Sequence, residues 1–309
     1  MPTQIKNVIF IGASGDLGGP VITHFLSLHN AQAPFTVSAL TRQNSTAILP
    51  SGINVIRTDY TIASLESALK GQDVVISMLG YDGIHLQKTI IDAAIKAGVK
   101  RFIPSEFGSR TYDDKVRDAV PIFGGKRQIV EYLKANEGKI SWTAVINGAL
   151  FDLGLKVGFL GFDLQSHRAK LFDAGTVPFG ATNLHTISHA LFSLLSSPSN
   201  FADLQNKYIH IASHMTTQQE ILAALEKITG KTWEKVPVNG RELSQTSLEK
   251  FQKGDSGALT GLIQAMTWGK LGDENLGDFR GEKLYNERLG LPKEDLEADV
   301  AAVLEGKAP

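Results

Sequence analysis

The sequence predicts an α/β fold with a doubly wound parallel sheet and a smaller, mixed C-terminal region. Short apolar runs of strand length alternate with helix-length stretches over the first half of the chain. The clearest runs, such as residues 8–11, are continuously apolar, as in parallel strands that helices cover on both faces. A glycine-rich turn joins the first run to the first helical stretch. Right-handed crossovers between such strands give a sheet with helices on both sides.

The elements of the first half follow from this alternation in order. Strands are expected at residues 8–11, 35–40, 53–56, 73–80, 101–104 and 140–146. Apolar residues spaced three or four apart predict helices at residues 17–28, 62–69, 86–98 and 126–136. Residues 1–152 are therefore expected to form one doubly wound domain.

After about residue 150 the alternation loosens, and we expect residues 153–309 to form a substrate-binding region. Helices are expected at residues 187–195 and 219–228, and residues 294–304 form an amphipathic stretch. Residues 208–212 are strand-like and are expected to return to the edge of the main sheet. Residues 253–279 are rich in glycine and aspartate and are expected to be a mobile segment.

Composition excludes several classes of protein. The 31 Lys and Arg residues balance the 32 Asp and Glu residues, so a nucleic-acid-binding face is not expected. Hydrophobic residues make up 42% of the chain, which excludes disorder of the whole chain. The absence of cysteine excludes disulfides, thiolate metal sites and a cysteine nucleophile, and it favours a cytoplasmic location. No apolar run reaches the ~20 residues of a membrane span, and the N-terminus lacks a signal-peptide pattern.

A glycine triplet follows the first strand. Gly12, Gly15 and Gly18 match the pattern GxxGxxG between an apolar run and a helical stretch. In nucleotide-binding folds the first glycine allows a tight turn, the second lets the backbone approach a pyrophosphate, and the third lets the helix pack against the strand. The start of the helix adds N–H donors for phosphate. This context predicts a dinucleotide-binding Rossmann domain over residues 1–152; the alternative is a tight turn that binds nothing.

The same region indicates which dinucleotide binds. An NAD site usually has an Asp or Glu at the end of the second strand, where it bonds the ribose hydroxyl. No acidic residue lies between Asp16 and Asp59, and Arg42 follows the second strand instead. A guanidinium pairs well with a phosphate, and Asn44 and Ser45 add donors, so we expect NADP(H) as the cofactor. The alternative is that Arg42 is a solvated loop residue.

The catalytic pair of ordinary short-chain dehydrogenases is absent. Those enzymes use Tyr-x-x-x-Lys, and none of the six tyrosines of this chain has a lysine four residues later. An ordinary alcohol dehydrogenase mechanism is therefore disfavoured.

Several motifs occur in an order that is similar to one protein family. They are the glycine turn, Arg42, residues 74–77, Pro-Ser-Glu-Phe-Gly at residues 104–108, and Phe-Gly-Gly-Lys at residues 123–126. Together they resemble the NmrA-like, isoflavone reductase-like branch of atypical short-chain dehydrogenases, which includes the phenylcoumaran benzylic ether reductases. Pro-Ser-Glu-Phe-Gly is the most specific motif, and the resemblance covers about residues 5–155. Residues 142–152 are similar to fungal members in particular.

The resemblance implies which residues act. In reductases of this family a lysine in Phe-x-x-Lys is the proposed catalytic group, and Lys126 matches it. The helix dipole disfavours a cation at the start of a helix, which lowers the pKa of such a lysine toward the range useful for proton transfer. The resemblance also implies that Phe107, Asn147 and Phe151, with Ser105, border a substrate pocket. The alternative is that Lys126 and its neighbour form a solvated surface pair.

The expected cofactor contacts lie at the carboxyl ends of the strands. They are Gly12, Ser14, Gly15, Asp16, Leu17, Gly18, Arg42, Leu79, Gly80, Ser105 and Lys126. No metal site is expected. The expected partner is a small-molecule substrate, bound by a monomer or a homodimer without contact with nucleic acid or membrane.

The leading interpretation is an NADPH-dependent reductase of an aromatic or conjugated metabolite. Hydride is expected to pass to an enone, a quinone methide or a benzylic carbon, while Lys126 moves a proton or stabilises the developing oxyanion. The first alternative is an NmrA-like regulator that senses NADP(H) and does no redox chemistry. The second is a redox-neutral isomerase or cyclase on the same fold.

Other polar groups are weaker candidates. His185 and His189 have the i, i+4 spacing of metal ligands but lack the Glu of His-Glu-x-x-His, so we expect a polar helix face. Asp113 and Asp114 are expected in a polar loop, and Glu106 is expected to fix the turn at residues 105–108. The phenylalanines at positions 151, 159, 162 and 172 fit either an aromatic pocket or core packing.

Overall fold

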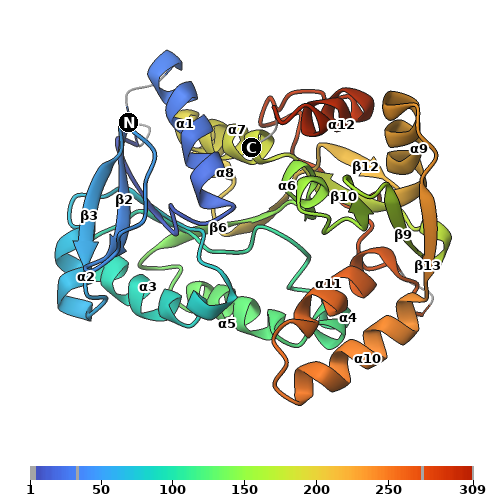
Figure 1. The fold of residues 1–309 in the computed structure, drawn as a ribbon. Helices are drawn as coiled ribbons and strands as arrows, with labels where there is room; N and C mark the ends of the chain where they lie inside the picture. Colours follow the sequence, from blue (N-terminus) through green and yellow to red (C-terminus); the bar gives the residue numbers. More distant parts are fainter. Residues whose placement is uncertain (1–4, 33–34, 273–274, 308–309) are drawn as a thin grey trace.

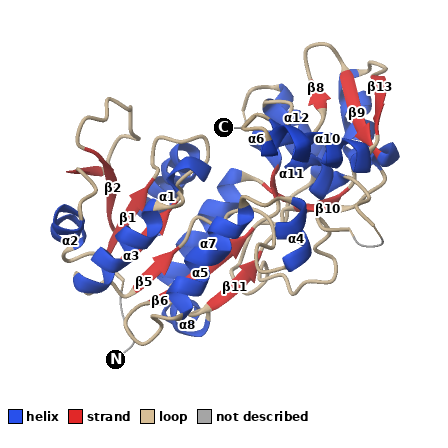
Figure 2. Ribbon diagram, turned by 90° about the horizontal axis from the view of Figure 1, so that it is seen from below, coloured by secondary structure: helices blue, strands red, loops and turns tan. Residues whose placement is uncertain are grey.

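The computed structural model describes residues 5–32, 35–272 and 275–307. It contains a large parallel sheet with its helices and a smaller mixed part (Figure 1, Figure 2). The first four residues of the N-terminal segment, where no signal peptide was expected, lie outside the described residues. Within the described ranges, no helix has the length and apolar character needed to cross a membrane.

A seven-stranded sheet forms the larger part, and all neighbouring strands in it are parallel. Its strands are β1 (Asn7–Ile11), β2 (Thr36–Arg42), β3 (Asn54–Thr58), β4 (Val74–Ser77), β5 (Arg101–Ile103), β6 (Ser141–Ile146) and β11 (Lys207–His210). The order across the sheet is β11-β6-β5-β4-β1-β2-β3, so the direction of winding reverses between β1 and β4. The doubly wound parallel sheet that the sequence predicts is confirmed. Ligands of such sheets bind at the carboxyl ends of the strands beside this switch point.

Helices cover both faces of the sheet, as Figure 1 shows. One face carries α1 (Gly18–Gln32), α7 (Leu184–Ser196) and α8 (Pro198–Asp203), and the other carries α2 (Ile62–Leu69), α3 (Leu86–Lys96) and α5 (Phe123–Lys134). Alternate side chains of β1 enter different cores. Phe10 packs against Phe25 of α1, whereas Ile9 and Ile11 pack with the apolar residues of α2 and α3. Burial on both faces explains why residues 8–11 are continuously apolar.

The seventh strand comes from the second half of the chain. β11 pairs in parallel with β6, at the sheet edge where the returning segment was expected. Leu184 and Ile187 of the preceding α7 share one core with Phe10 of β1. Residues 184–210 therefore belong to the larger part, although they follow residue 153 in the sequence.

The smaller part contains two mixed sheets of three strands. Their strands are β7 (Ala149–Leu150), β10 (Phe179–Thr182) and β12 (His214–Thr216), and β8 (Phe162–Asp163), β9 (Arg168–Phe172) and β13 (Glu234–Val238). The remaining helices are α4 (Asp114–Ala119), α6 (Phe151–Lys156), α9 (Gln218–Thr229), α10 (Gly240–Gln252), α11 (Ala258–Trp268) and α12 (Leu296–Leu304), with 3-10 turns η1 (Tyr81–Gly83) and η2 (Asp173–Gly175). The helices expected at residues 187–195 and 219–228 are α7 and α9, and the amphipathic stretch contains α12.

Two expectations about loops are wrong in part. Residues 253–279 contain helix α11, whose Leu262 and Met266 are buried in a small core with residues of α4, so the middle of this stretch is helical and packed. Residues 273–274 of the stretch lie outside the described residues. Asp113 is the last residue of the loop before α4, where its carboxylate accepts a hydrogen bond from the Lys115 N–H and caps the helix, whereas Asp114 is the first residue of α4 and not a loop residue.

Candidate functional site

The glycine turn lies at the switch point between β1 and β4. Gly12 has a φ of +86°, and a Cβ on it would lie 2.4 Å from the carbonyl oxygen of Met78, just after β4. A Cβ on Gly18 would lie 2.1 Å from the carbonyl oxygen of Gly12. The fold itself therefore requires glycine at both positions, for the backbone conformation of the turn and for the close approach of α1.

Gly15 differs from these two glycines. A Cβ on Gly15 would meet only the Gly12 carbonyl oxygen, at the ordinary contact distance of 3.5 Å. Gly15 and both its neighbours are exposed, and the N–H groups of Ser14, Asp16 and Leu17 make no hydrogen bond within the described residues. Free N–H groups at the start of a helix form a binding site for phosphate. The turn therefore fits a pyrophosphate that approaches Gly15 from outside.

Two guanidinium groups lie at the next strand end. Arg42 ends β2 and is exposed. Arg57 of the adjacent β3 donates from Nη1 to the carbonyl oxygens of Arg42, Gln43 and Ser45, the last at 2.8 Å. Arg57 thus shapes the loop that begins with Arg42, and the pair fits a second phosphate. Sequence analysis missed Arg57 because the register of β2 against β3 cannot be read locally.

The Pro-Ser-Glu-Phe-Gly segment follows β5 at the same edge of the sheet. Ser105 Oγ donates to the Leu79 carbonyl oxygen at 2.7 Å, and the Ser105 N–H donates to Gln87 Oε1 of α3 at 2.9 Å. The Gly108 carbonyl oxygen accepts bonds from two consecutive N–H groups that follow β6, starting with Asn147. The segment is therefore tied to the turns after β4 and β6, and its backbone is held from both sides.

Lys126 is the fourth residue of α5, and only 8% of its surface is exposed. Its Nζ donates to the backbone carbonyl oxygen of Glu106 at 2.6 Å, 5.5 Å from the ring centre of Tyr81 and 5.9 Å from that of Phe123. The alternative of a solvated surface pair is therefore wrong. Burial lowers the pKa of Lys126, against the opposing effect of the Glu106 carboxylate. The direction agrees with the prediction, but the main cause is burial.

Glu106 supplies a second buried charge beside this lysine. Its side chain is 1% exposed, Oε2 accepts a hydrogen bond from Thr111 Oγ1 at 2.5 Å, and Oε1 has no partner within the described residues. Burial raises the pKa of Glu106, against the opposing effects of Lys126, Thr111 and Arg127. The carboxylate, which was expected to fix the turn at residues 105–108, bonds Thr111 instead. We call Tyr81, Glu106, Thr111, Phe123 and Lys126 the lysine site.

The three residues expected to border a substrate are all buried. Asn147 is fully buried, and its Oδ1 has no partner within the described part of the chain. Phe107 lies in the core of the larger part, and Phe151 lies in the core of the smaller part, 4.7 Å from the His214 ring. Phe162 and Phe172 lie in the same core and Phe159 packs against it, which agrees with core packing for this group.

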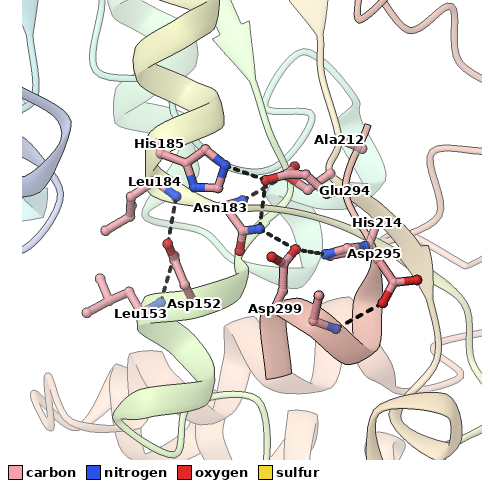
Figure 3. Close-up of polar contacts among 12 residues, drawn as sticks. Asp152, Leu153, Asn183, Leu184, His185, Ala212, His214, Glu294, Asp295 and Asp299 are labelled. Carbon is pink, nitrogen blue, oxygen red and sulfur yellow. Dashed lines mark hydrogen bonds and ion pairs between the residues drawn. The ribbon is translucent and has the colours of Figure 1, made fainter. Parts of the chain in front are cut away.

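A second group of polar side chains, some buried and some partly exposed, lies between the two parts of the molecule (Figure 3). We call it the junction cluster, and it consists of Asp152, Asn183, His185, His214, Glu294 and Asp299. The carboxylate of Asp152, near the start of α6, accepts hydrogen bonds from the N–H groups of Leu153 and Leu184, at 2.8 and 3.0 Å. The bond from Leu184 ties α6 to the start of α7.

The other members join α7 and β12 to the C-terminal segment. Asn183 Nδ2 donates to Glu294 at 2.9 Å and to Asp299 at 2.7 Å. His185 pairs with Glu294 and His214 pairs with Asp299, each at 2.7 Å. Burial opposes ionisation of Glu294, but hydrogen bonds from His185, Asn183 and Ser213 outweigh it and lower its pKa to about 2.

His185 and His189 lie on the polar helix face that was expected, and both are partly exposed. The ring of His24, on α1, packs against both, with ring centres 5.8 and 5.0 Å away. Burial, together with the other two histidines, lowers the pKa of His24 to about 4, while the hydrogen bond to Glu294 raises that of His185. Among the described side chains, no group of three or more His, Asp or Glu residues is arranged to hold a metal ion.

Comparison with known proteins agrees with this architecture. Residues 4–262 match the model of the NmrA-like family. Oxidoreductase aprR of Aspergillus flavus is 36% identical and covers 97% of this chain and 99% of its own. Oxidoreductase poxI of Penicillium oxalicum is 31% identical, with coverages of 95% and 92%. The solved structure of AtPrR2 with NADP+ and (+)pinoresinol superposes with a TM-score of 0.75 at 19% identity, over 97% of this chain and 99% of that one.

Proposed function

This chain belongs to the NmrA-like family, and from that premise we propose that it is an NADPH-dependent reductase of an aromatic or conjugated small metabolite. The observation that carries the proposal is Lys126, a buried amine at the carboxyl edge of the sheet whose hydrogen-bond acceptor is a neutral carbonyl oxygen. Two fungal relatives that span nearly the whole chain are named oxidoreductases, which supports redox chemistry. A structure of the same fold holds NADP+, which supports the choice of cofactor.

The glycine turn and the arginines after β2 and in β3 hold the cofactor in this proposal. The free N–H groups of Ser14, Asp16 and Leu17 bind the pyrophosphate, and Arg42 pairs with the 2′-phosphate. Leu79, Gly80 and Ser105, at the ends of β4 and β5, border the nicotinamide end. When bound, NADPH supplies a hydride to the substrate carbon.

Lys126 supplies the proton. Hydride addition to an enone, a quinone methide or a benzylic ether carbon leaves negative charge on a substrate oxygen. The Lys126 ammonium donates its proton to that oxygen and regains one from water, so substrate, NADPH and H+ give reduced product and NADP+. Burial lowers the pKa of Lys126 and brings the amine closer to the working pH, which favours proton transfer.

Asn147 is the proposed polar contact for the substrate. Its Oδ1 is buried and unpartnered within the described residues, and a carbonyl oxygen of this kind accepts a hydrogen bond from a phenol or alcohol. The proposal therefore expects a substrate with a hydroxyl group near the reacting carbon. Phe107 and Phe151 are buried and form part of the wall of the proposed substrate site.

The test is the stoichiometry of reduction. Enones, quinone methides and aryl benzylic ethers are incubated with the protein and NADPH deuterated at the transferable position, and NADPH loss and product are measured in the same sample. The proposal expects one NADPH oxidised per product formed, with deuterium on the product carbon. Tight NADPH binding without turnover across the panel would indicate the regulator instead. Product formed without NADPH loss would indicate a redox-neutral enzyme.

A further inference from the structure

We infer that Glu106 is a positioning residue for Lys126, with a buried carboxylate that keeps the Lys126 side chain protonated inside the site. The inference concerns the charge of Lys126 and rests on the proposed function only for its catalytic consequence. It is argued from four features of the lysine site: the surroundings of the amine, the surroundings of the carboxylate, the rigidity of the segment between them, and the charges nearby.

The surroundings of Lys126 favour a neutral amine. The amine is buried, its hydrogen bond goes to an uncharged carbonyl oxygen, and its other close neighbours are the rings of Tyr81 and Phe123. These two rings are stacked, with their centres 6.1 Å apart. A carbonyl and two ring faces attract a cation weakly compared with the cost of removing an ammonium from water. A nearby anion is therefore needed to keep the group charged.

The Glu106 carboxylate is that anion. It belongs to the same residue whose carbonyl oxygen accepts the Lys126 hydrogen bond, so amine and carboxylate share one buried region. One carboxylate oxygen accepts from Thr111, and the other is buried without a partner. A carboxylate that only fixed a turn would use both oxygens in hydrogen bonds. An unpartnered buried oxygen is costly, and the positive charge of Lys126 offsets part of that cost.

The backbone that carries the Glu106 carboxylate is held in place. The segment that carries it is held at Ser105 by Gln87 and the Leu79 carbonyl oxygen, and at Gly108 by the N–H groups after β6. Its hydrogen-bond partner Thr111 is fully buried. The charge of Glu106 is therefore presented to Lys126 at a fixed place.

The other titratable groups around the pair come from three elements. Tyr81 of η1 has a pKa raised to about 12, by burial and then by Glu106, so it stays neutral. Tyr208 of β11 also has a raised pKa, from burial and then Glu106. Arg127, beside Lys126 on α5, is paired with Glu131 at 2.6 Å. Like Lys126, it lowers the pKa of Glu106. Among these groups, only Glu106 raises the pKa of Lys126.

Glu106→Gln tests the inference, because an amide oxygen can still accept the Thr111 hydrogen bond while the charge is lost. Lysine is labelled with ¹³C at Cε, and the Lys126 signal, assigned by its absence from Lys126→Met, is titrated in the full chain with and without NADP+. We expect Glu106→Gln to move the Lys126 titration to lower pH by about one pH unit or more, the effect of losing an adjacent opposite charge. In the pH profile of kcat, the limb that reflects the titration of Lys126 should also move to lower pH, whether the lysine acts as acid or as base.

Glu131→Gln is the matched control, since it removes a half-exposed carboxylate from the same helix and should leave the Lys126 titration in place. If Glu106→Gln does not fold, the reciprocal measurement replaces it: in ¹³C-carboxyl-labelled protein, one buried glutamate should titrate at higher pH in Lys126→Met than in wild type. A Lys126 titration that is the same in wild type and Glu106→Gln overturns the inference, as does an unchanged glutamate titration in Lys126→Met. Neither result depends on turnover, so failure of the proposed reductase activity is a separate outcome.

Discussion

The lysine site and the junction cluster both bury charged side chains, but they satisfy them differently. In the junction cluster each carboxylate accepts two hydrogen bonds at normal distances, from two N–H groups at Asp152 and from an amide and an imidazole at each of Glu294 and Asp299, although Glu294 Oε2 bonds nothing within the described residues. In the lysine site the amine bonds a neutral carbonyl oxygen, and one oxygen of Glu106 bonds nothing within the described residues.

This difference separates stabilising polar groups from reactive ones. A buried charge with several hydrogen-bond partners holds elements together, and removing one partner is costly. A buried charge with a single partner costs stability in the folded chain, and such a cost is retained where chemistry uses it. In our proposal the junction cluster therefore ties the two parts of the molecule together, whereas the lysine site binds a ligand.

The largest effects should come from the glycine turn, where one glycine is required for folding and another for ligand binding. Gly18→Ala puts a Cβ 2.1 Å from a backbone oxygen and should prevent normal folding, seen as loss of a cooperative thermal transition. Gly15→Val meets no such contact and should fold normally while losing measurable NADPH binding, because its side chain fills the place of the pyrophosphate. Normal NADPH affinity in Gly15→Val would mean that the turn is only structural.

Two buried asparagines give the sharpest comparison of the regions. Asn183→Leu removes two hydrogen bonds to carboxylates in the junction cluster and should lower the free energy of unfolding by about 3 kcal/mol. Asn147→Leu removes one bond to a neighbouring carbonyl oxygen and should cost less than about 1 kcal/mol, while it lowers kcat/KM for a hydroxylated substrate. Chemical denaturation of both variants measures the two changes in the free energy of unfolding. Equal losses of stability would remove the distinction between the regions.

The two regions also differ in how far the sequence could predict them. The glycine turn, the strands and Arg42 were predicted because each depends on neighbouring residues. Lys126 was identified by resemblance, and its burial could not be inferred because it depends on Tyr81 and the loop after β5. The junction cluster was missed because its bonds between elements join residues that are 32 to 116 positions apart in the chain. The spacing of His185 and His189 was visible, but their contacts with His24 and Glu294 were not.

Arg42 tests the ligand-binding side of the comparison. Wild type should bind NADPH at least about tenfold more tightly than NADH, a difference of ~1.4 kcal/mol from the phosphate contact. Arg42→Ala should reduce this preference with little change in stability, since the side chain is exposed. Calorimetric titration of both cofactors into both proteins decides the point. Equal affinities of wild type for the two cofactors would refute the assignment of the phosphate site.

The smallest effect concerns the histidines packed beside the junction cluster. The pKa of His24 is about 4 in the folded chain against 6.5 unfolded, so the unfolded chain takes up its proton first as the pH falls. Stability should therefore decrease between pH 6.5 and 4 by about 1 kcal/mol, allowing for solvent screening. His24→Phe should remove that decrease, as measured by urea denaturation at neutral and mildly acidic pH.

Two neighbours of His24 titrate differently and serve as checks. His185 has a raised pKa and loses its contribution to stability as the pH rises through that value, while Glu294, with a pKa of about 2, loses its contribution only below about 4.5. A wild-type stability that rises between pH 6.5 and 4 would contradict the account of this region.

The most direct test of the central claim measures turnover and stability together in Lys126→Met. Methionine fills a similar volume without a charge, and replacing an incompletely partnered buried cation with an apolar group should leave the free energy of unfolding unchanged or raised. Turnover should fall by ~10² or more, the usual effect of losing a general acid, and Lys126→Arg should not restore it because guanidinium does not release its proton. Wild-type turnover in Lys126→Met, or a loss of stability as large as that of Asn183→Leu, would contradict the claim that the lysine site is built for chemistry and the junction cluster for stability.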